Sequence, residues 1–324
     1  MKKAFSLIEL SIVILIIGIL IAGVTQSSRL INAMRVATAR NFTSSSPVAS
    51  IEGIMFWYET SLETSFIRGE SSDGKVITQW KDNNPQTTDK HNAFAGQRTD
   101  SSAISYNPAP GASAENTSGP TYIQNGINDL PTLRFTNDNA LAYRYLTVDG
   151  NVKNIVDQDI TAFAVVSYRS GTGWIIDRTC VNESLAPVDC SVSINAGMPL
   201  FGVWTLSGEL RFDRRDDYGN TPNSDWNIAT GYTMDASQKY VITLERKYGI
   251  SLNIYVNGTV VSSEPDAFGA MNLSPIKIGR HADNDSDNID VDISEVIFFS
   301  GMFKTEDRIA VEAYLGKKYG VKMN

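Results

Sequence analysis

Residues 5–24 read FSLIELSIVILIIGILIAGV, and this stretch determines how the chain begins to fold. Fifteen of its 20 residues are apolar, and Glu9 carries its only charge. Twenty residues in a helix extend about 30 Å, which is the thickness of the hydrocarbon core of a bilayer. We therefore predict a helix that spans a membrane once.

The helical pattern continues beyond this apolar stretch. Apolar residues recur there at spacings of three to four, at Leu30, Ile31, Met34 and Ala37. We predict one continuous helix over residues 5–43. A secretory signal peptide also begins with basic residues and an apolar stretch, but a cleavage site would interrupt this helix. A charge inside an apolar helix costs about 2.5–3.5 kcal/mol, so Glu9 needs a partner.

The first residues, Met1-Lys2-Lys3-Ala4 followed by Phe-Ser-Leu-Ile-Glu, resemble the type IV prepilin and pseudopilin family. The resemblance covers about 40 residues. It implies a basic leader, residues 1–4, that a prepilin peptidase removes between Ala4 and Phe5. Phe5 would then be N-methylated, and Glu9 would pair with the free amine of a neighbouring subunit's Phe5. The partners implied are the peptidase, other pilin or pseudopilin subunits and inner-membrane lipid.

The chain departs from that family in two places. Ala4 stands before the cleaved bond, where the family usually has glycine. Major pilins commonly carry a proline that kinks the helix, and none occurs between Met1 and Ser46.

After a linker at residues 44–50, the pattern changes to short apolar or alternating runs between turn residues. Short strands of this kind indicate an all-β, antiparallel sandwich over residues 51–324. The runs are 51–58, 76–80, 132–135, 160–168, 174–176, 200–204, 209–212, 240–244, 251–256, 276–278 and 291–299. Asn257-Gly258 predicts a type I′ hairpin turn. A short helix should close the chain, capped by Thr305 and ending at Gly320.

Several of these runs resemble the concanavalin A-like, laminin G-type jelly roll. The resemblance is carried by Phe56-Trp57-Tyr58-Glu59, Val76-Ile77-Thr78-Gln79-Trp80, Pro131-Thr132-Leu133-Arg134-Phe135, Ile254-Tyr255-Val256-Asn257-Gly258, Ile293-Ser294-Glu295-Val296 and the closing Tyr314-Leu315-Gly316-Lys317-Lys318-Tyr319-Gly320. It implies two packed antiparallel sheets, with Trp57 and Trp80 in the core. Members of this family bind glycans or serve as interaction and spacer modules, so the fold does not fix the function.

An acidic loop is the one candidate metal site. Asp283, Asp285 and Asp287 occupy the first, third and fifth positions of a calcium loop, with Asp290 behind them. An EF-hand is excluded because Asn288 stands where that motif needs glycine. A looser calcium loop and a solvated acidic hairpin both remain open. Calcium is the only cofactor that the sequence suggests.

The segment Asp290-Val291-Asp292-Ile293-Ser294-Glu295 resembles the catalytic strand of retaining glucanases with this fold, which needs two neighbouring carboxylates. In a regular strand Glu295 faces away from Asp290 and Asp292. The resemblance keeps a membrane-tethered glycan hydrolase as an alternative. Because a regular strand separates the carboxylates, we expect that the chain is not an enzyme.

Two further features concern the surface of the sandwich. A polar, turn-rich stretch is the predicted ligand loop, with Asp213, Arg215, Asp217, Tyr218 and Trp226. Cys180 and Cys190 are the only cysteines, and their close spacing in an exported chain predicts a disulfide.

Composition limits the remaining function classes. The formal charge of −8 argues against nucleic acid as a partner, and two histidines exclude a His-rich metal centre. We predict a minor pilin or pseudopilin whose head binds glycans or surface proteins. It would cross the inner membrane once, with the head extracytoplasmic, and then join a pilus or periplasmic pseudopilus. A plain membrane-anchored extracytoplasmic binding protein is the other alternative.

Overall fold

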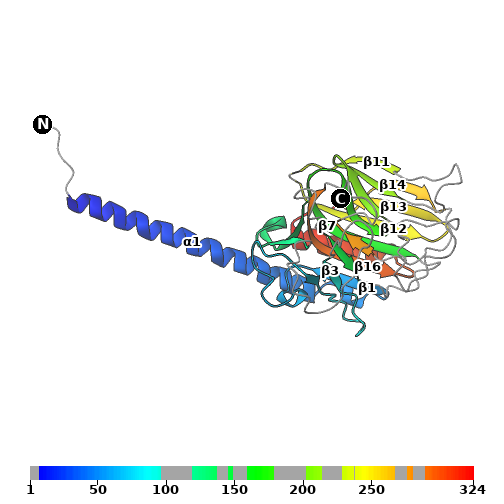
Figure 1. The fold of residues 1–324 in the computed structure, drawn as a ribbon, viewed down its shortest axis with the longest axis horizontal. Helices are drawn as coiled ribbons and strands as arrows, with labels where there is room; N and C mark the ends of the chain where they lie inside the picture. Colours follow the sequence, from blue (N-terminus) through cyan, green and yellow to red (C-terminus); the bar gives the residue numbers. More distant parts are fainter. Residues whose placement is uncertain are drawn as a thin grey trace, which may run out of the picture.

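The structure is a computed structural model in which one long helix projects from a β-rich head (Figure 1). It describes residues 7–95, 119–136, 145–148, 159–178, 202–213, 228–236, 238–266, 276–279 and 289–324. The head contains two antiparallel sheets, as the sequence predicted, and a second helix near the C-terminus. The predicted all-β sandwich with one helix at each end is therefore confirmed.

The projecting helix, α1, spans Leu7–Ser44 and has 38 residues. Several of its Ser and Thr hydroxyls donate to the backbone carbonyl four residues earlier, as Ser11 does to Leu7 at 2.8 Å and Thr43 to Ala39 at 3.1 Å. These hydroxyls are thereby satisfied within the helix. Within the described residues, no helix meets both the length and the hydropathy of a membrane span. The predicted span is thus not confirmed by the structure and stays a prediction.

Eight described strands form sheet A, in the order β14-β13-β12-β7-β16-β5-β4, with β1 also paired to β16. Their bounds are β1 (Ile54–Glu59), β4 (Thr121–Ile123), β5 (Thr132–Phe135), β7 (Ile160–Ser170), β12 (Tyr240–Lys247), β13 (Ser251–Val256), β14 (Thr259–Pro265) and β16 (Asp290–Ser300). Strands β1 and β5 lie on the same side of β16, one after the other along its length.

Eight described strands also form sheet B, in the order β11-β10-β9-β8-β15-β6-β3-β2. Their bounds are β2 (Gln79–Trp80), β3 (Ala93–Ala95), β6 (Leu146–Val148), β8 (Gly173–Arg178), β9 (Gly202–Leu206), β10 (Glu209–Asp213), β11 (Ile228–Thr233) and β15 (Ile276–Ile278). The run predicted at residues 76–80 pairs as a strand only at Gln79–Trp80, with an isolated bridge at Val76.

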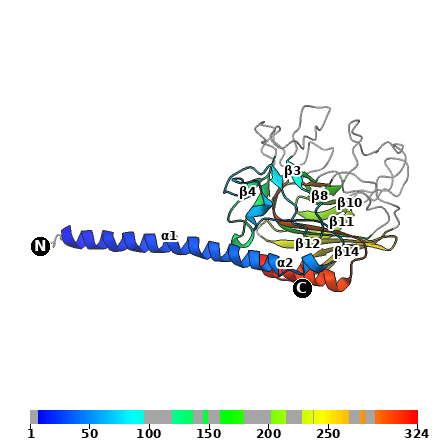
Figure 2. The same cartoon turned by 90° about the horizontal axis from the view of Figure 1, so that it is seen from below.

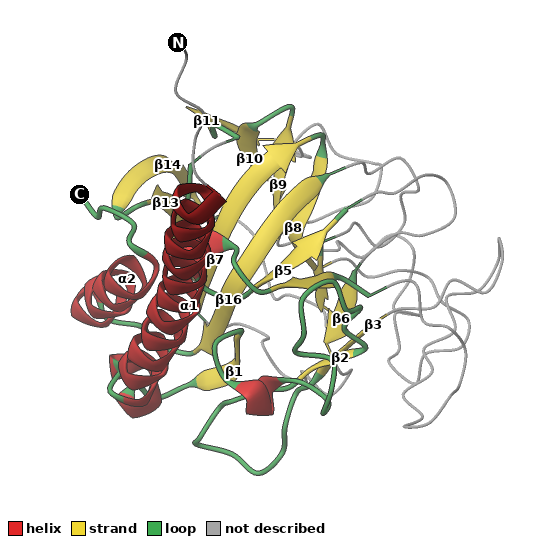
Figure 3. Ribbon diagram, turned by 90° about the vertical axis from the view of Figure 1, so that its left-hand side faces the viewer, coloured by secondary structure: helices red, strands yellow, loops and turns green. Residues whose placement is uncertain are grey.

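Sheet A is apolar on both faces. Ala162, Ala164 and Val166 of β7 face sheet B, whereas Phe163 and Val165 face outward. The outer face is covered by the end of α1 and by α2 (Thr305–Tyr319), which lie side by side over it (Figures 2 and 3). Strands buried on both faces lose the alternation of apolar and polar residues, which explains the continuous apolar sequence of β7 and β16.

Two turns have the backbone conformation that the sequence predicted. Asn257 and Gly258 have φ of 52° and 83°, as the predicted type I′ hairpin between β13 and β14 requires. Helix α2 ends at Gly320, whose φ of 62° is left-handed. The predicted cap is wrong by one residue, because Thr305 is the first helical residue and Lys304 precedes it without a side-chain cap.

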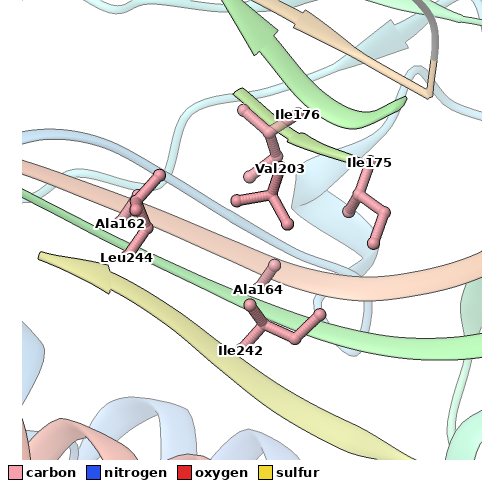
Figure 4. A pocket seen from close by; sticks show the side chains of 7 residues that line it. All are labelled: Ala162, Ala164, Ile175, Ile176, Val203, Ile242 and Leu244. Carbon is pink, nitrogen blue, oxygen red and sulfur yellow. The ribbon is translucent and has the colours of Figure 1, made fainter. Parts of the chain in front are cut away.

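A small void lies between the two sheets, where β7 and β12 face β8 and β9 (Figure 4). The volume of this void that the centre of a water molecule can occupy is about 10 Å³. Its lining side chains are all aliphatic: Ala162, Ala164, Ile175, Ile176, Val203, Ile242 and Leu244. A water needs two or more polar partners, so this space is a packing defect and not a ligand pocket.

Residues 44–50, predicted as a linker, include a short 3-10 helix, η1 (Pro47–Ser50). Val48 in this segment is fully buried and packs in the apolar cluster beneath the two helices. Gln86 donates to the carbonyls of Ala49 and Ile51, at 3.2 and 2.7 Å. The segment that joins α1 to β1 is therefore packed against the head.

Candidate functional site

Four elements bring polar side chains together where α1 meets the head. Thr43 comes from the last turn of α1, Glu59 from the end of β1, Glu295 from the middle of β16 and Lys318 from the last turn of α2. The two carboxylates and the ammonium are essentially inaccessible to water, since their side chains are at most 1% exposed. We call this group the junction cluster.

The ammonium of Lys318 is at the centre of the junction cluster. It donates to Glu59 Oε2 and Glu295 Oε2, both at 2.8 Å, and to Thr43 Oγ1 at 2.7 Å. The hydroxyl of Tyr314 lies 3.2 Å away. Three good acceptors match the three protons of the ammonium, so this buried cation is fully satisfied.

Glu295 is equally well satisfied. Its Oε1 accepts from the indole of Trp57 at 2.7 Å and from the hydroxyl of Tyr314 at 2.8 Å. Its Oε2 accepts from the hydroxyl of Tyr319 at 2.9 Å as well as from Lys318. With four donors around it, this carboxylate has no free oxygen to offer a substrate.

Glu59 is held by the backbone that follows it. It accepts from the Ser61 amide at 3.0 Å, the Ser61 hydroxyl at 2.5 Å and the Leu62 amide at 2.6 Å. Burial by itself would raise the pKa of the Glu59 carboxyl, but the charge and hydrogen bond of Lys318 and the Ser61 donors bring it below its ordinary value.

Burial would lower the pKa of the Lys318 ammonium, but attraction to Glu295 and Glu59 raises it well above its ordinary value. The cluster thus holds one positive and two negative charges, and neutral donors stabilise the extra negative charge. Removing one partner from such a buried group leaves an uncompensated charge. This arrangement joins α1, β1, β16 and α2, and it contains no accessible nucleophile or base.

The face on which Glu295 lies differs from our expectation. The register of β16 against β7 shifts between Ile293 and Glu295, which marks a bulge. Glu295 therefore lies on the outer face of sheet A together with Asp292, not opposite to it. Asp292 is engaged by Arg134, with contacts at 2.7 and 2.9 Å. Arg134 engages Asp292, and Lys318, shared with Glu59, engages Glu295, so the structure gives the hydrolase alternative no support.

Outward from the junction cluster, three further residues of α1 make polar contacts with the head. Arg40 donates to the Ser61 carbonyl at 2.9 Å and pairs with Glu63 at 3.0 Å. Arg35 pairs with Asp129, and the amide of Asn32 donates to Asn125 at 3.2 Å. The helix is thus bound to the head from Asn32 to its end.

The turn that carries Asp129 has an unusual backbone. Asn128 and Asp129, in the 3-10 turn η4 (Ile127–Asp129), both have φ of 56°. Left-handed conformations cost non-glycine residues about 1–2 kcal/mol each, somewhat less for Asn and Asp. Ile127 and Leu130 are each 2% exposed beneath this turn. Buried packing on both sides of the two residues holds the backbone in this conformation.

The predicted ligand loop lies mostly outside the described residues. Asp213 ends β10, and only its backbone is described. Arg215, Asp217, Tyr218 and Trp226 lie outside the described residues. Their role stays a prediction.

Next to that loop, sheet B carries a ladder of side chains that the sequence analysis missed. Trp174 stacks on Trp204 with ring centroids 5.8 Å apart, and the guanidinium of Arg211 is 5.7 Å from the Trp204 ring. The ring of Trp174 packs against Gly202, where an added Cβ would lie 2.0 Å from the ring. Trp204 on β9 and Arg211 on β10 are next to Val203 and Leu210, which point into the core. Because successive side chains of a strand point to opposite faces, Trp204 and Arg211 lie on the face of sheet B that points away from the core.

Most of the remaining predicted site residues are not described. Ala4, Phe5, Cys180 and Cys190 lie outside the described residues, so processing and the disulfide stay predictions. Glu9 lies in α1 and is exposed. Trp57 and Trp80, predicted in the core, are 4% and 0% exposed, so that prediction is confirmed.

The calcium loop also stays a prediction. Asp283, Asp285 and Asp287 lie outside the described residues. Asp290 begins β16 and accepts from the Ser170 hydroxyl at 3.3 Å. Among the described residues, no group of three or more His, Cys, Asp or Glu side chains is placed to hold a metal.

The junction cluster makes a prediction about stability. Lys318→Met should lower the free energy of unfolding by about 3–5 kcal/mol, because two buried carboxylates lose their cation. Lys317→Met is the matched control, since Lys317 is exposed and lies over the ring of Phe42. It should cost at most about 1 kcal/mol, the value of an exposed cation–π contact. Urea unfolding of the full chain in detergent, followed by tryptophan fluorescence, measures both, and equal stability of the two variants would contradict the prediction.

The pH dependence of stability follows from the same residues. The raised pKa of Lys318 means that its contribution is complete below about pH 10.5 and is lost as the pH rises further. The lowered pKa of Glu59 means that its contribution is complete above about pH 4.5 and is lost as the pH falls. We therefore expect a plateau of stability between these limits.

Glu59→Gln should flatten the acid side of that curve. Because the charge of Glu59 also helps to raise the pKa of Lys318, the variant should make the alkaline side shallower as well. Asp82, whose pKa burial raises, acts in the opposite direction, so the slope is compared between the variant and the native chain. Urea midpoints from pH 3 to 11 provide the measurement. An acid side as steep in Glu59→Gln as in the native chain would contradict the assignment.

Residues 1–25 match the prokaryotic N-terminal methylation motif. No curated protein matches the chain. Among solved structures, the binding domain of Paraclostridial Mosquitocidal Protein 1 is 11% identical with a TM-score of 0.49, covering 81% of this chain and 52% of that one. A structure of botulinum neurotoxin type C, whose cell entry depends on two ganglioside molecules, is 14% identical with a TM-score of 0.47, covering 83% and 53%.

A third structure, the binding domain of botulinum neurotoxin DC with rat synaptotagmin II, is 12% identical with a TM-score of 0.46, covering 82% and 52%. The chain therefore spans about half the length of these solved proteins. The match at residues 1–25 supports the type IV pilin motif that the sequence predicted for the N-terminal segment.

Proposed function

We propose that the chain is a minor pilin or pseudopilin subunit, which assembles through α1 and displays the β-sandwich as a head. The observation that carries the proposal is the methylation motif at residues 1–25, which overlaps the first part of a 38-residue helix fixed to the head. A helix that both assembles and is packed against its head can place that head at a defined position on a fibre.

The exposed surface of α1 supports assembly. Twelve large apolar side chains between Leu7 and Ile21 are 48–83% exposed, and they lie all around the helix. A helix that is apolar on every side needs an apolar environment. We propose that inner-membrane lipid covers it before assembly and that neighbouring helices cover it afterwards. The hydroxyl of Ser11 donates a hydrogen bond to the backbone carbonyl of Leu7, so it leaves no unsatisfied polar group on this surface.

Glu9 is the one carboxylate in the apolar part of α1. A carboxylate is costly in such surroundings unless a cation lies beside it. We propose that this cation is the amine of a neighbouring subunit's Phe5, made available when prepilin peptidase cuts after Ala4. The subunit would then pass from the inner membrane, with its head extracytoplasmic, into a pilus or periplasmic pseudopilus.

We also propose that the head recognises glycans or surface proteins. The two helices cover the outer face of sheet A alone, and sheet B lies on the opposite side of the head (Figure 2). Sheet B carries the Trp174–Trp204–Arg211 ladder next to Asp213, the first residue of the predicted ligand loop. Binding residues commonly lie on loops that a rigid scaffold positions.

The mature N-terminus tests the assembly role. We expect mass spectrometry of the native protein to show a chain that begins with N-methylated Phe5 and lacks Met1 to Ala4. Glu9→Ala should be cleaved equally well but should no longer enter fibres, because the Phe5 amine loses its partner. Glu52→Ala, an exposed carboxylate on the head, is the matched control and should assemble normally. An intact Met1 in the native protein would refute the proposal and favour a plain membrane anchor.

The binding role has a separate test. A glycan array probed with the full chain in detergent should show binding that Trp226→Ala weakens at least about tenfold, since stacking on an aromatic ring is lost. Running the array in calcium and in chelator tests the acidic loop at the same time. Lack of binding under both conditions would remove the glycan role and leave the structural one.

A further inference from the structure

We propose that Asp129 and Arg35 form a releasable clasp, which lets the long helix pivot on the head just before its last two turns. The inference goes beyond the proposed function and does not depend on it. It rests on the difference between two zones in which the head holds α1.

The inner zone is closed to water. Ala39 is 2% exposed, Thr43 is 6% exposed, and Thr43 accepts a hydrogen bond from the buried Lys318 ammonium. Releasing this part of the helix would expose a lysine that two carboxylates hold. The end of α1 therefore stays in place as long as the head is folded.

The outer zone is open to water. The side chains of Arg35 and Asp129 are 47% and 55% exposed, and the Asn32–Asn125 hydrogen bond is exposed as well. Leu30 and Met34, which flank these contacts on the helix, are 62% and 61% exposed, so they bury little surface against the head. Exposed ion pairs are weak and are screened by salt. The outer zone can thus open while the inner zone stays closed.

The backbone of the head explains how Asp129 reaches the helix. The left-handed Asn128 and Asp129 turn the chain outward at this point, above buried Ile127 and Leu130. A β-carbon on Gly320 would lie 3.0 Å from the Asn128 amide, so the end of α2 supports the turn from behind. A conformation that its surroundings enforce against local preference is a feature of switch and clamp segments. The turn presents the carboxylate whether or not Arg35 is bound.

The part of α1 between the two zones provides the pivot. Thr38 donates to the Met34 carbonyl at 2.9 Å, a back-bond that favours a bend in a helix. Val36 packs only at the margin of the apolar cluster, and Ala39 lies inside it. Opening the clasp would therefore tilt residues 7–35 relative to the head, without unfolding any element.

Distance measurements between spin labels on unnatural amino acids test the clasp in the full chain in detergent. Labels at positions 30 and 67, both exposed, report on the outer zone, and labels at 41 and 67 report on the inner zone. At low salt we expect one narrow distance for each pair. At about 1 M salt, where the screening length is about 3 Å, the 30–67 distribution should broaden and the 41–67 distribution should not.

Three variants identify the residues. Arg35→Gln should broaden the 30–67 distribution already at low salt, with about a two- to fivefold larger open population, as loss of one exposed ion pair implies. The charge swap Arg35→Asp with Asp129→Arg should restore the narrow distribution. Arg29→Gln, an exposed arginine on the same helix, is the control and should change nothing.

Two outcomes would overturn the proposal. If Arg35→Gln leaves the 30–67 distribution unchanged at every salt concentration, Asp129 does not hold the helix. If the 41–67 distribution broadens together with the 30–67 distribution, the whole junction moves and α1 has no pivot.

Discussion

The rest of the structure depends on one buried ammonium. Lys318 lies between Glu59 and Glu295, with Thr43 of the long helix as its third acceptor. These contacts fix the end of α1, the central strand β16 and the C-terminal helix in one geometry. Separating these buried charges would leave at least one of them without a partner, at a high cost in free energy. The cluster therefore imposes a single arrangement on the elements around it and fixes the head on the protruding helix.

The second constraint is that sheet A is covered on both sides. Sheet B packs on its inner face, and the two helices pack on its outer face around residues such as Phe163, Phe299 and Leu315. The head and the end of the helix therefore share one core. The bulge in β16 contributes to this shared core, because it places Glu295 on the outer face next to Lys318 and leaves Val296 and Phe298 on the inner face.

The sequence predicted those parts of the structure that local patterns determine. Apolar residues at helical spacing predicted α1, and Asn257-Gly258 predicted its hairpin because few residues accept positive φ. The junction cluster is different, since its members are separated by up to 275 residues in the chain. Lys317 and Lys318 both suited a helix end, and only the spacing of Lys318 from Val311, Tyr314 and Leu315 distinguished the buried one. The bulge at Ser294 and the left-handed Asn128-Asp129 pair arise from tertiary packing, which no local pattern encodes.

The shared core has a practical consequence for anyone who wishes to study the head in water. The apolar part of α1 would have to be removed for this purpose, and the segment at residues 44–50 directly after the helix suggests a place to cut. A cut there would remove Ala39 and Thr43, leaving an apolar hollow and a lysine without one of its acceptors. A chain that starts near Asn32 would lose the apolar surface of Leu7 to Ile21 and keep every contact that closes the core.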